Sequence, residues 1–236
     1  MDYPRRNKKI VYLCKKSYRS KNMNRIVIII LLLMSQAVSV MAQIPSGRSA
    51  EVTLLKDFKP VTVVMKNGKI NQLRYGNVFL KNSTLVYRQT ANSTVMEANM
   101  DVVKHIILDK RTFVSLDNQL AEVLDTIADS YLMRVRTIDT ETMKAEYLNE
   151  SNYTNFDLGE VFSFTRSDAL EKQEPYPLLD KYYFVIKGKK ILAHERNVRN
   201  SISRKRLAAY DTMINMGFSW SSIDDLRRML EFLCEK

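Results

Sequence analysis

The strongest constraint on this chain is a run of nine consecutive apolar residues at positions 26–34, directly after Arg25. Small and mixed residues follow, and the stretch ends with Val40 and Ala42 at the third and first positions before Gln43. A basic start, an apolar core and compact side chains at those two positions are the three parts of a secretory signal peptide. The pattern predicts export, cleavage between Ala42 and Gln43, and a folded domain that begins after that point.

The alternative is an uncleaved anchor. Residues 26–42 number 17, the short end of the roughly 17–25 that an α-helix needs to cross a bilayer. An anchor with its basic flank on the cytoplasmic side also satisfies the positive-inside rule. The basic region before the run is long for a signal peptide, and a start at Met23 would shorten it, so we expect residues 1–22 to reflect an upstream start codon. No cysteine follows the run directly, so the sequence gives no indication of a lipid anchor there.

The formal net charge of +11 is concentrated at the start of the chain. Residues 1–25 carry a net charge of +8, which leaves only +3 on residues 26–236. The basic charge therefore belongs mainly to the flank of the apolar run, and it gives no reason to expect nucleic-acid binding by an exported domain. The two cysteines, Cys14 and Cys234, fall on opposite sides of the run, so we expect no disulfide between them and a buried thiol at Cys234.

The clearest local structure in residues 51–170 is a β-hairpin at residues 60–73. Asn67 and Gly68 tolerate the positive φ angles of a two-residue type I′ turn, whose twist matches that of paired strands. A two-residue loop at this point predicts that Met65 lies opposite Ile70.

The other strand candidates are short apolar segments separated by Asn, Asp, Gly or Ser. They are residues 77–80 and 84–88, which form a second hairpin, and residues 102–108, 112–116, 131–138, 143–148, 159–165 and 182–187. Residues 119–129 fit either a helix or a strand. Strands in this rhythm are typical of an antiparallel meander, a sandwich or an open barrel.

The last 39 residues change to helical spacing. A first helix is expected at residues 202–216, and Gly217 is its expected stop because glycine accepts the left-handed conformation that ends helices. Ser222 is the expected N-cap of a second helix, with Asp225 in the capping-box position. The second helix places one apolar set on a single face: Ile223, Leu226, Leu230 and Leu233.

These patterns predict the domain organisation. The expected parts are residues 1–42 as basic region plus signal peptide, 43–50 as a linker, 51–170 as a β-rich domain, 171–177 as an internal linker, and 178–236 as a final strand plus a helical pair.

No residue set meets the requirements of a catalytic, cofactor or metal site. His194 begins a zinc-protease pattern, but the position that needs the second histidine holds Val198. His105 is expected to share a strand face with Val103 and Ile107, in a structural role. The six glycines in the chain form neither a phosphate-binding loop nor a nucleophile elbow.

Carboxylates offer the remaining route to enzymatic activity. Asp224 and Asp225 are explained by helix capping and by the helix dipole, and Asp139 and Glu141 fall in an expected turn. A hydrolase that uses scattered carboxylates stays open as an alternative. It requires two acids in one cleft with raised pKa values.

One local charge cluster stands out at residues 187–206, where the net charge is +7. It contains Lys187, Lys189, Lys190, Arg196, Arg199, Arg204, Lys205 and Arg206. Two interpretations remain: a patch for an anionic glycan, lipid head group or acidic protein, or a solvated turn and helix start whose aliphatic stems cover apolar surface. The second is favoured.

Several segments resemble a known group of proteins. The sequence around Ala42 and Gln43 resembles the signal peptides of exported Bacteroidetes proteins. Further likeness to an uncharacterised, exported β-rich family of that group lies in residues 79–82, 85–87, 98–100, 120–126 and 182–188. The resemblance implies a location outside the cytoplasm and no assigned activity.

Together these features predict an α+β, mostly antiparallel β domain with a C-terminal helical hairpin. We expect a periplasmic or surface-associated protein of the cell envelope that binds or scaffolds an envelope protein or a glycan without catalysing a reaction. Membrane contact is expected only through the export segment, and no cofactor is expected.

Overall fold

The computed structural model describes residues 47–150 and 175–235. The chain divides into two compact units, Met1–Pro45 and Ser46–Lys236, and all described elements belong to the second. The predicted export segment and the predicted strand at residues 159–165 lie outside the described residues. In the described part of the chain, no helix has the length and apolar character needed to cross a membrane.

Within the described ranges, eleven antiparallel strands form one sheet. They are β1 (Arg48–Ser49), β2 (Lys59–Met65), β3 (Ile70–Phe79), β4 (Thr84–Arg88), β5 (Met96–Glu97), β6 (Val103–Leu108), β7 (Arg111–Leu116), β8 (Gln119–Ile127), β9 (Ser130–Ile138), β10 (Tyr176–Ile186) and β11 (Lys189–Leu192). The order across the sheet is β1-β10-β9-β8-β7-β6-β2-β3-β4-β5, with β11 also beside β10. The predicted α+β, mostly antiparallel class is confirmed.

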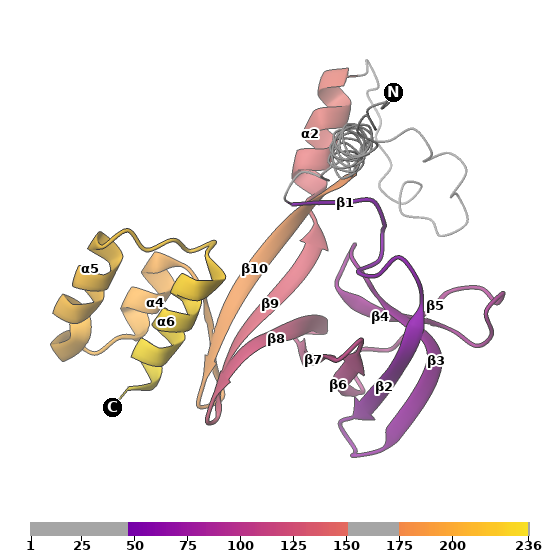
Figure 1. Cartoon of the computed structure of the whole chain (residues 1–236), viewed down its shortest axis with the longest axis horizontal. Coiled ribbons are helices and arrows are strands. Elements are labelled where there is room, and N and C mark those ends of the chain that lie inside the picture. Colours follow the sequence, from indigo (N-terminus) through magenta and orange to yellow (C-terminus); the bar gives the residue numbers. More distant parts are fainter. Residues whose placement is uncertain (1–46, 151–174, 236) are drawn as a thin grey trace, which may run out of the picture. The chain divides into compact units, whose positions relative to one another are not determined.

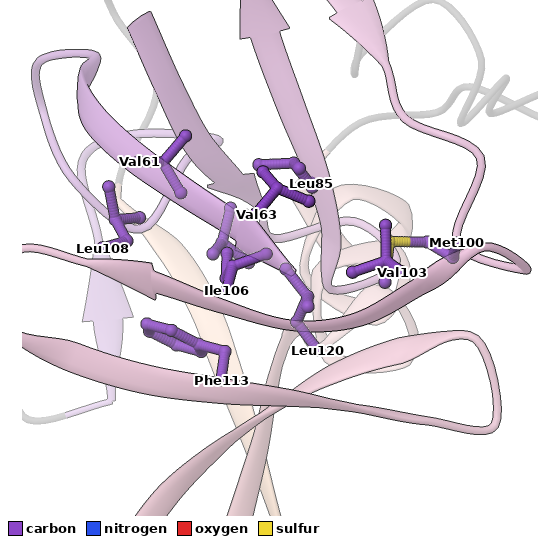
Figure 2. Close-up of a cluster of buried hydrophobic side chains, with 10 residues drawn as sticks. Val61, Val63, Leu85, Met100, Val103, Ile106, Leu108, Phe113 and Leu120 are labelled. Atoms are coloured by element: carbon purple, nitrogen blue, oxygen red, sulfur yellow. The ribbon is translucent and has the colours of Figure 1, made fainter. Parts of the chain in front are cut away.

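The sheet curls into a partly closed barrel because the β3–β4 turn reaches β8 and β9. The Ser83 hydroxyl donates to the Leu120 carbonyl at 2.8 Å, and the Leu120 N–H donates to the Ser83 carbonyl at 2.6 Å. The Ile138 N–H donates to the Leu80 carbonyl at 2.7 Å. Figure 2 shows the core enclosed by this curl, where side chains from β2, β4, β6, β7 and β8 gather between the strands.

The first hairpin forms, but its predicted register is wrong by one residue. Val64, not Met65, lies opposite Ile70. The Gly68 N–H donates to the Met65 carbonyl and the Met65 N–H donates to the Lys69 carbonyl, each at 2.9 Å. Gly68 has a φ of 84°, whereas the φ of Asn67 is not positive. The loop is therefore a three-residue turn with glycine in the left-handed position, not a type I′ turn.

Residues 143–148, predicted as a strand, belong to helix α2 (Thr140–Glu150). The Asp139 carboxylate accepts a hydrogen bond from the Thr142 N–H at 3.1 Å. This bond satisfies one of the backbone N–H groups that have no intrahelical acceptor at the start of a helix. Farther along α2, Glu146 accepts from the Arg48 guanidinium at 3.0 Å. The cap at Asp139 and the ion pair between Glu146 and Arg48 thus stabilise a helix in this segment.

Most other predicted strands are confirmed. The second hairpin is β3–β4, the segments at 102–108, 112–116 and 131–138 are β6, β7 and β9, and the ambiguous residues 119–129 contain strand β8. β10 begins at Tyr176, six residues before the predicted start and inside the predicted linker at 171–177. Residues 171–174 lie outside the described part of the chain.

The C-terminal helices pack against side chains from β8, β9, β10 and β11 (Figure 1). They are α4 (Glu195–Ser201), the 3-10 turn η2 (Arg204–Arg206), α5 (Leu207–Asn215) and α6 (Ile223–Cys234). The predicted first helix starts later than expected, at Leu207, and Gly217 ends it with a φ of 89°, as predicted. Their shared core buries Phe184 from β10 and Tyr210 from α5 against the α6 side chains Leu226, Met229 and Leu230.

Ser222 caps α6, as predicted, because its hydroxyl accepts from the Asp225 N–H at 3.3 Å. Ser222→Ala is expected to lower the free energy of unfolding by about 1 kcal/mol, the usual cost of losing an N-cap oxygen. Urea denaturation of the purified domain measures this loss. Ser203 is the matched control, since it precedes η2 without a capping hydrogen bond, and Ser203→Ala should change little. Equal losses in the two variants would contradict the capping role.

Candidate functional site

A ladder of charged side chains crosses four adjacent strands. Glu122 on β8 lies opposite Arg134 on β9, and Asp180 on β10 lies opposite Arg136 on β9. Arg134 donates to Glu122 at 2.6 Å and also lies 3.6 Å from Asp180, so it joins the two pairs. Arg111 on β7 lies 3.6 Å from Glu122 at the end of the ladder. Cross-strand partners of opposite charge stabilise this region of the sheet.

Asp180 is the most strongly held carboxylate of this ladder. Arg136 donates to both of its oxygens at 2.7 Å in a bidentate pair, and Arg134 adds a third contact. The same hydrogen bonds raise the pKa of Arg136 above its ordinary value. The Tyr182 hydroxyl lies 3.5 Å from the Asp180 carboxylate, and burial, together with that negative charge, raises the pKa of Tyr182. Asp180 therefore accepts hydrogen bonds from Arg136 through both of its carboxylate oxygens.

The outer edge of β10 is interrupted next to Asp180. β1 pairs with Tyr176 and Pro177, and β11 pairs with β10 only from Tyr183 onwards. The Leu178 N–H donates to Gly47 and the Tyr182 carbonyl accepts from Ala193, so alternate residues of β10 point their main-chain groups to this edge. The N–H and C=O of Asp180 point the same way, and no described residue bonds to them.

A cavity of about 630 Å³ opens at this gap. Asp180 and Tyr182 line it from β10, Ala193 and His194 from the segment after β11, and Trp220 and Ser221 from the connection between α5 and α6. Its volume falls in the range of about 300–1,000 Å³ that is typical of small-molecule sites. Two aromatic rings, a serine hydroxyl, an imidazole and the Asp180 main-chain groups, which bond to no other described residue, thus meet at this opening.

The connection that carries Trp220 and Ser221 is held in place by several contacts. The Phe218 and Trp220 rings meet edge to face, with centroids 4.8 Å apart and planes at 64°. The Ser219 N–H donates to the Asp225 carboxylate at 3.0 Å. A hydrogen bond from Arg228, followed by the bond from Ser219, lowers the pKa of Asp225. This contribution to stability is present above the unfolded-state pKa of Asp225 and is lost as the pH falls through its folded-state pKa.

Three members of the predicted basic cluster have partners within the chain. Lys190 pairs with Asp117 of the β7–β8 turn. Arg199 pairs with Asp211 of α5. Arg206 lies 4.1 Å from the centre of the Phe232 ring and donates to the Glu235 carbonyl at 3.0 Å. Its positive charge at this position stabilises the C-terminal end of α6 through the helix dipole. These three side chains stabilise the fold.

The other five members of the cluster are exposed: Lys187, Lys189, Arg196, Arg204 and Lys205. They extend from the β10–β11 turn to η2. Lys190 and Arg199 are exposed as well, so seven of the eight members of the predicted cluster lie at the surface, and two of these seven also have partners within the chain.

The remaining predicted residues take structural positions. His105 does not share a face with Val103 as predicted, because the register between β2 and β6 shifts and turns Val103 into the core. Cys234 has a free, half-buried thiol packed against the helical core. Among the described residues, no group of three or more His, Cys, Asp or Glu side chains is placed to hold a metal ion.

Comparison with known proteins gives no assignment. The chain matches no protein-family model, and searches of curated proteins and of solved structures found no match. The function therefore has to be argued from the chemistry of the site.

Proposed function

We propose that this protein is exported and acts outside the cytoplasm as a non-enzymatic binding protein of the cell envelope. The observation that carries the proposal is the cavity beside β10, which is open and lined by aromatic and polar groups. Its one carboxylate, Asp180, is already bound by two arginines. The cavity offers groups that recognise a ligand, and its acid is not arranged to transfer a proton.

The alternative of a hydrolase with scattered carboxylates fits this arrangement poorly. Glycoside hydrolysis uses two carboxyl groups on either side of the bond that breaks, with a raised pKa on the acid. The cavity presents a single carboxylate in a bidentate ion pair. Four described carboxylates have clearly shifted pKa values, and hydrogen bonds lower every one of them: Asp109, Asp139, Glu146 and Asp225. The direction is opposite to that of a general acid.

Export is supported by the layout of the chain. The second compact unit begins at Ser46, just after the proposed cleavage point between Ala42 and Gln43. The anchored alternative differs only in the fate of residues 1–42, and it leaves the described unit outside the cytoplasm as well. The exposed basic side chains, among them Lys189, Arg204 and Lys205, are a proposed secondary contact for anionic envelope components.

Site-specific photo-cross-linking in the native envelope tests the binding function. A photo-reactive amino acid at Leu192, a lining residue that is 38% exposed, should give a discrete cross-linked product. Filling the cavity with Ala193→Phe should remove that product. The same probe at Ile70, which is 61% exposed on the β2–β3 hairpin, is the matched control and should give none. Identical products from both positions, or a Leu192 product that survives Ala193→Phe, would refute binding at the cavity.

A further inference from the structure

We propose that the cavity beside β10 binds a neutral sugar unit of an envelope glycan, an inference that rests on the binding function proposed above. A sugar ring presents apolar C–H faces and a rim of hydroxyl groups that both donate and accept hydrogen bonds. The cavity offers the matching groups. Tyr182 and Trp220 supply aromatic surface. Ser221 supplies a hydroxyl, and the N–H and C=O of Asp180, to which no other described residue bonds, supply a donor and an acceptor.

The cavity is lined by one carboxylate, Asp180, and by one lysine, Lys181, so its formal charges balance and favour a neutral ligand. The Asp180 carboxylate is neutralised by its bidentate pair with Arg136 and by Arg134, so it attracts a cation only weakly. Its oxygens still accept hydrogen bonds, and the nearby Tyr182 hydroxyl can donate or accept. An anionic ligand would meet this carboxylate at the gap, whereas a polyhydroxylated ligand bonds to it without burying an unpaired charge.

The geometry of the gap disfavours an extended peptide. A peptide that adds to a sheet edge needs a row of free main-chain groups along several residues. Here β1 covers the edge at Tyr176 and Pro177, and β11 covers it from Tyr183, so the gap centres on Asp180 alone. A compact ligand uses one donor and one acceptor at that point, and an added strand would collide with β1 and β11.

Contacts within the chain hold the side chains of the lining in place. The Phe218 ring fixes Trp220 edge to face, and Asp225 fixes the connection through the Ser219 N–H at 3.0 Å. The bidentate pair with Arg136 holds the Asp180 carboxylate in position. A site with few rotamers left to freeze loses less entropy on binding, which favours the modest contact area of a single sugar unit.

The test uses the domain from Gln43 to Lys236 and a panel of neutral oligosaccharides of one to four rings, built from glucose, mannose, galactose or N-acetylglucosamine. Trp220 is the single tryptophan of the chain, so its fluorescence reports directly on the cavity. At least one series should change this fluorescence in a saturable way and show the same affinity by calorimetry. Trp220→Ala and Ala193→Phe should each weaken binding about tenfold or more by calorimetry. Met216→Ala, at an 81% exposed position before the connection, is the control and should bind normally.

Three outcomes would overturn the sugar proposal: no panel member binds, binding survives both cavity variants, or extended peptides bind the cavity in place of sugars. The binding function itself is judged separately by the cross-link at Leu192. A cavity-dependent cross-link without sugar binding would overturn the ligand class and leave the binding function standing.

Discussion

Gly76→Ala is expected to destabilise the domain by about 3 kcal/mol, because overpacking a filled core forces backbone and side chains apart. Gly76 lies in β3 opposite Lys59, next to a bulge in β3: three steps from Gly76 to Leu73 face only two steps of β2, from Lys59 to Val61. A methyl group at this position would lie 3.1 Å from the Val61 Cβ atom and well inside van der Waals contact with a Val61 methyl group. Val61 is only 1% exposed and β-branched, so it has little freedom to move aside. Denaturant unfolding measures the loss.

Two further variants separate this close approach from a general effect of replacing glycine. Gly188→Asn, at a turn with a φ of 80° and open space around it, should cost less than about 1 kcal/mol because asparagine tolerates the left-handed region. Combining Gly76→Ala with Val61→Ala should give a loss well below the sum of the single losses, since the second change removes the clashing methyl. A Gly76→Ala domain as stable as the wild type would show that the bulge does not bring these residues together.

Arg134→Met is expected to cost about 3 kcal/mol, the scale for removing one partner of a buried ion pair. The substitution would leave Glu122, a residue only 8% exposed, without its 2.6 Å partner. It would also remove one contact of Asp180. The remaining Arg111 lies 3.6 Å from Glu122 and compensates only in part. Urea denaturation measures this loss, which should appear as a lower midpoint concentration with an unchanged m-value.

Replacing both partners provides the control for the ladder. The combination Glu122→Leu with Arg134→Met should recover most of the lost stability, because apolar pairs of similar volume often replace buried ion pairs at little cost. Lys59→Met breaks an exposed pair with Asp109 at 2.9 Å and should destabilise the domain far less than Arg134→Met does, because solvent screens exposed ion pairs. If Arg134→Met costs no more than Lys59→Met, the ladder does not stabilise the fold.

The first hairpin shows what the sequence determines and what tertiary packing adds. Asn67 and Gly68 predict a turn, yet a two-residue and a three-residue loop both fit these residues. The predicted register would turn Arg74 inward beside Val61, whereas the observed register places Leu73 opposite Val61. A shift of one residue exchanges the two faces of a strand, so burial of the apolar face selects the loop.

Helix α2 illustrates the limit of local patterns. The sequence around Met143 predicts a strand. Met143 is buried, but it lies in a helix that Asp139 caps. The pair between Glu146 and Arg48 joins residues far apart in the sequence. Such tertiary contacts override weak local preferences.

The sequence does not predict the cavity, because its walls come from segments that meet only in the folded chain. Alternation alone places Asp180 and Tyr182 on one strand face. The gap itself depends on where β1 and β11 pair with β10, and the facing wall comes from the connection that carries Trp220. Basic residues are conspicuous in a sequence, so the sequence predicts a candidate binding patch at residues 187–206. Three of its members turn out to bind partners within the chain.

We propose that the described domain is cut from an export segment at residues 26–42 and is released outside the cytoplasm. The most direct measurement is the intact mass of the protein recovered from the envelope fraction of its native cells. The account predicts a chain that begins at Gln43. A full-length chain that begins at Met1 or Met23, recovered from the cytoplasm, would contradict it.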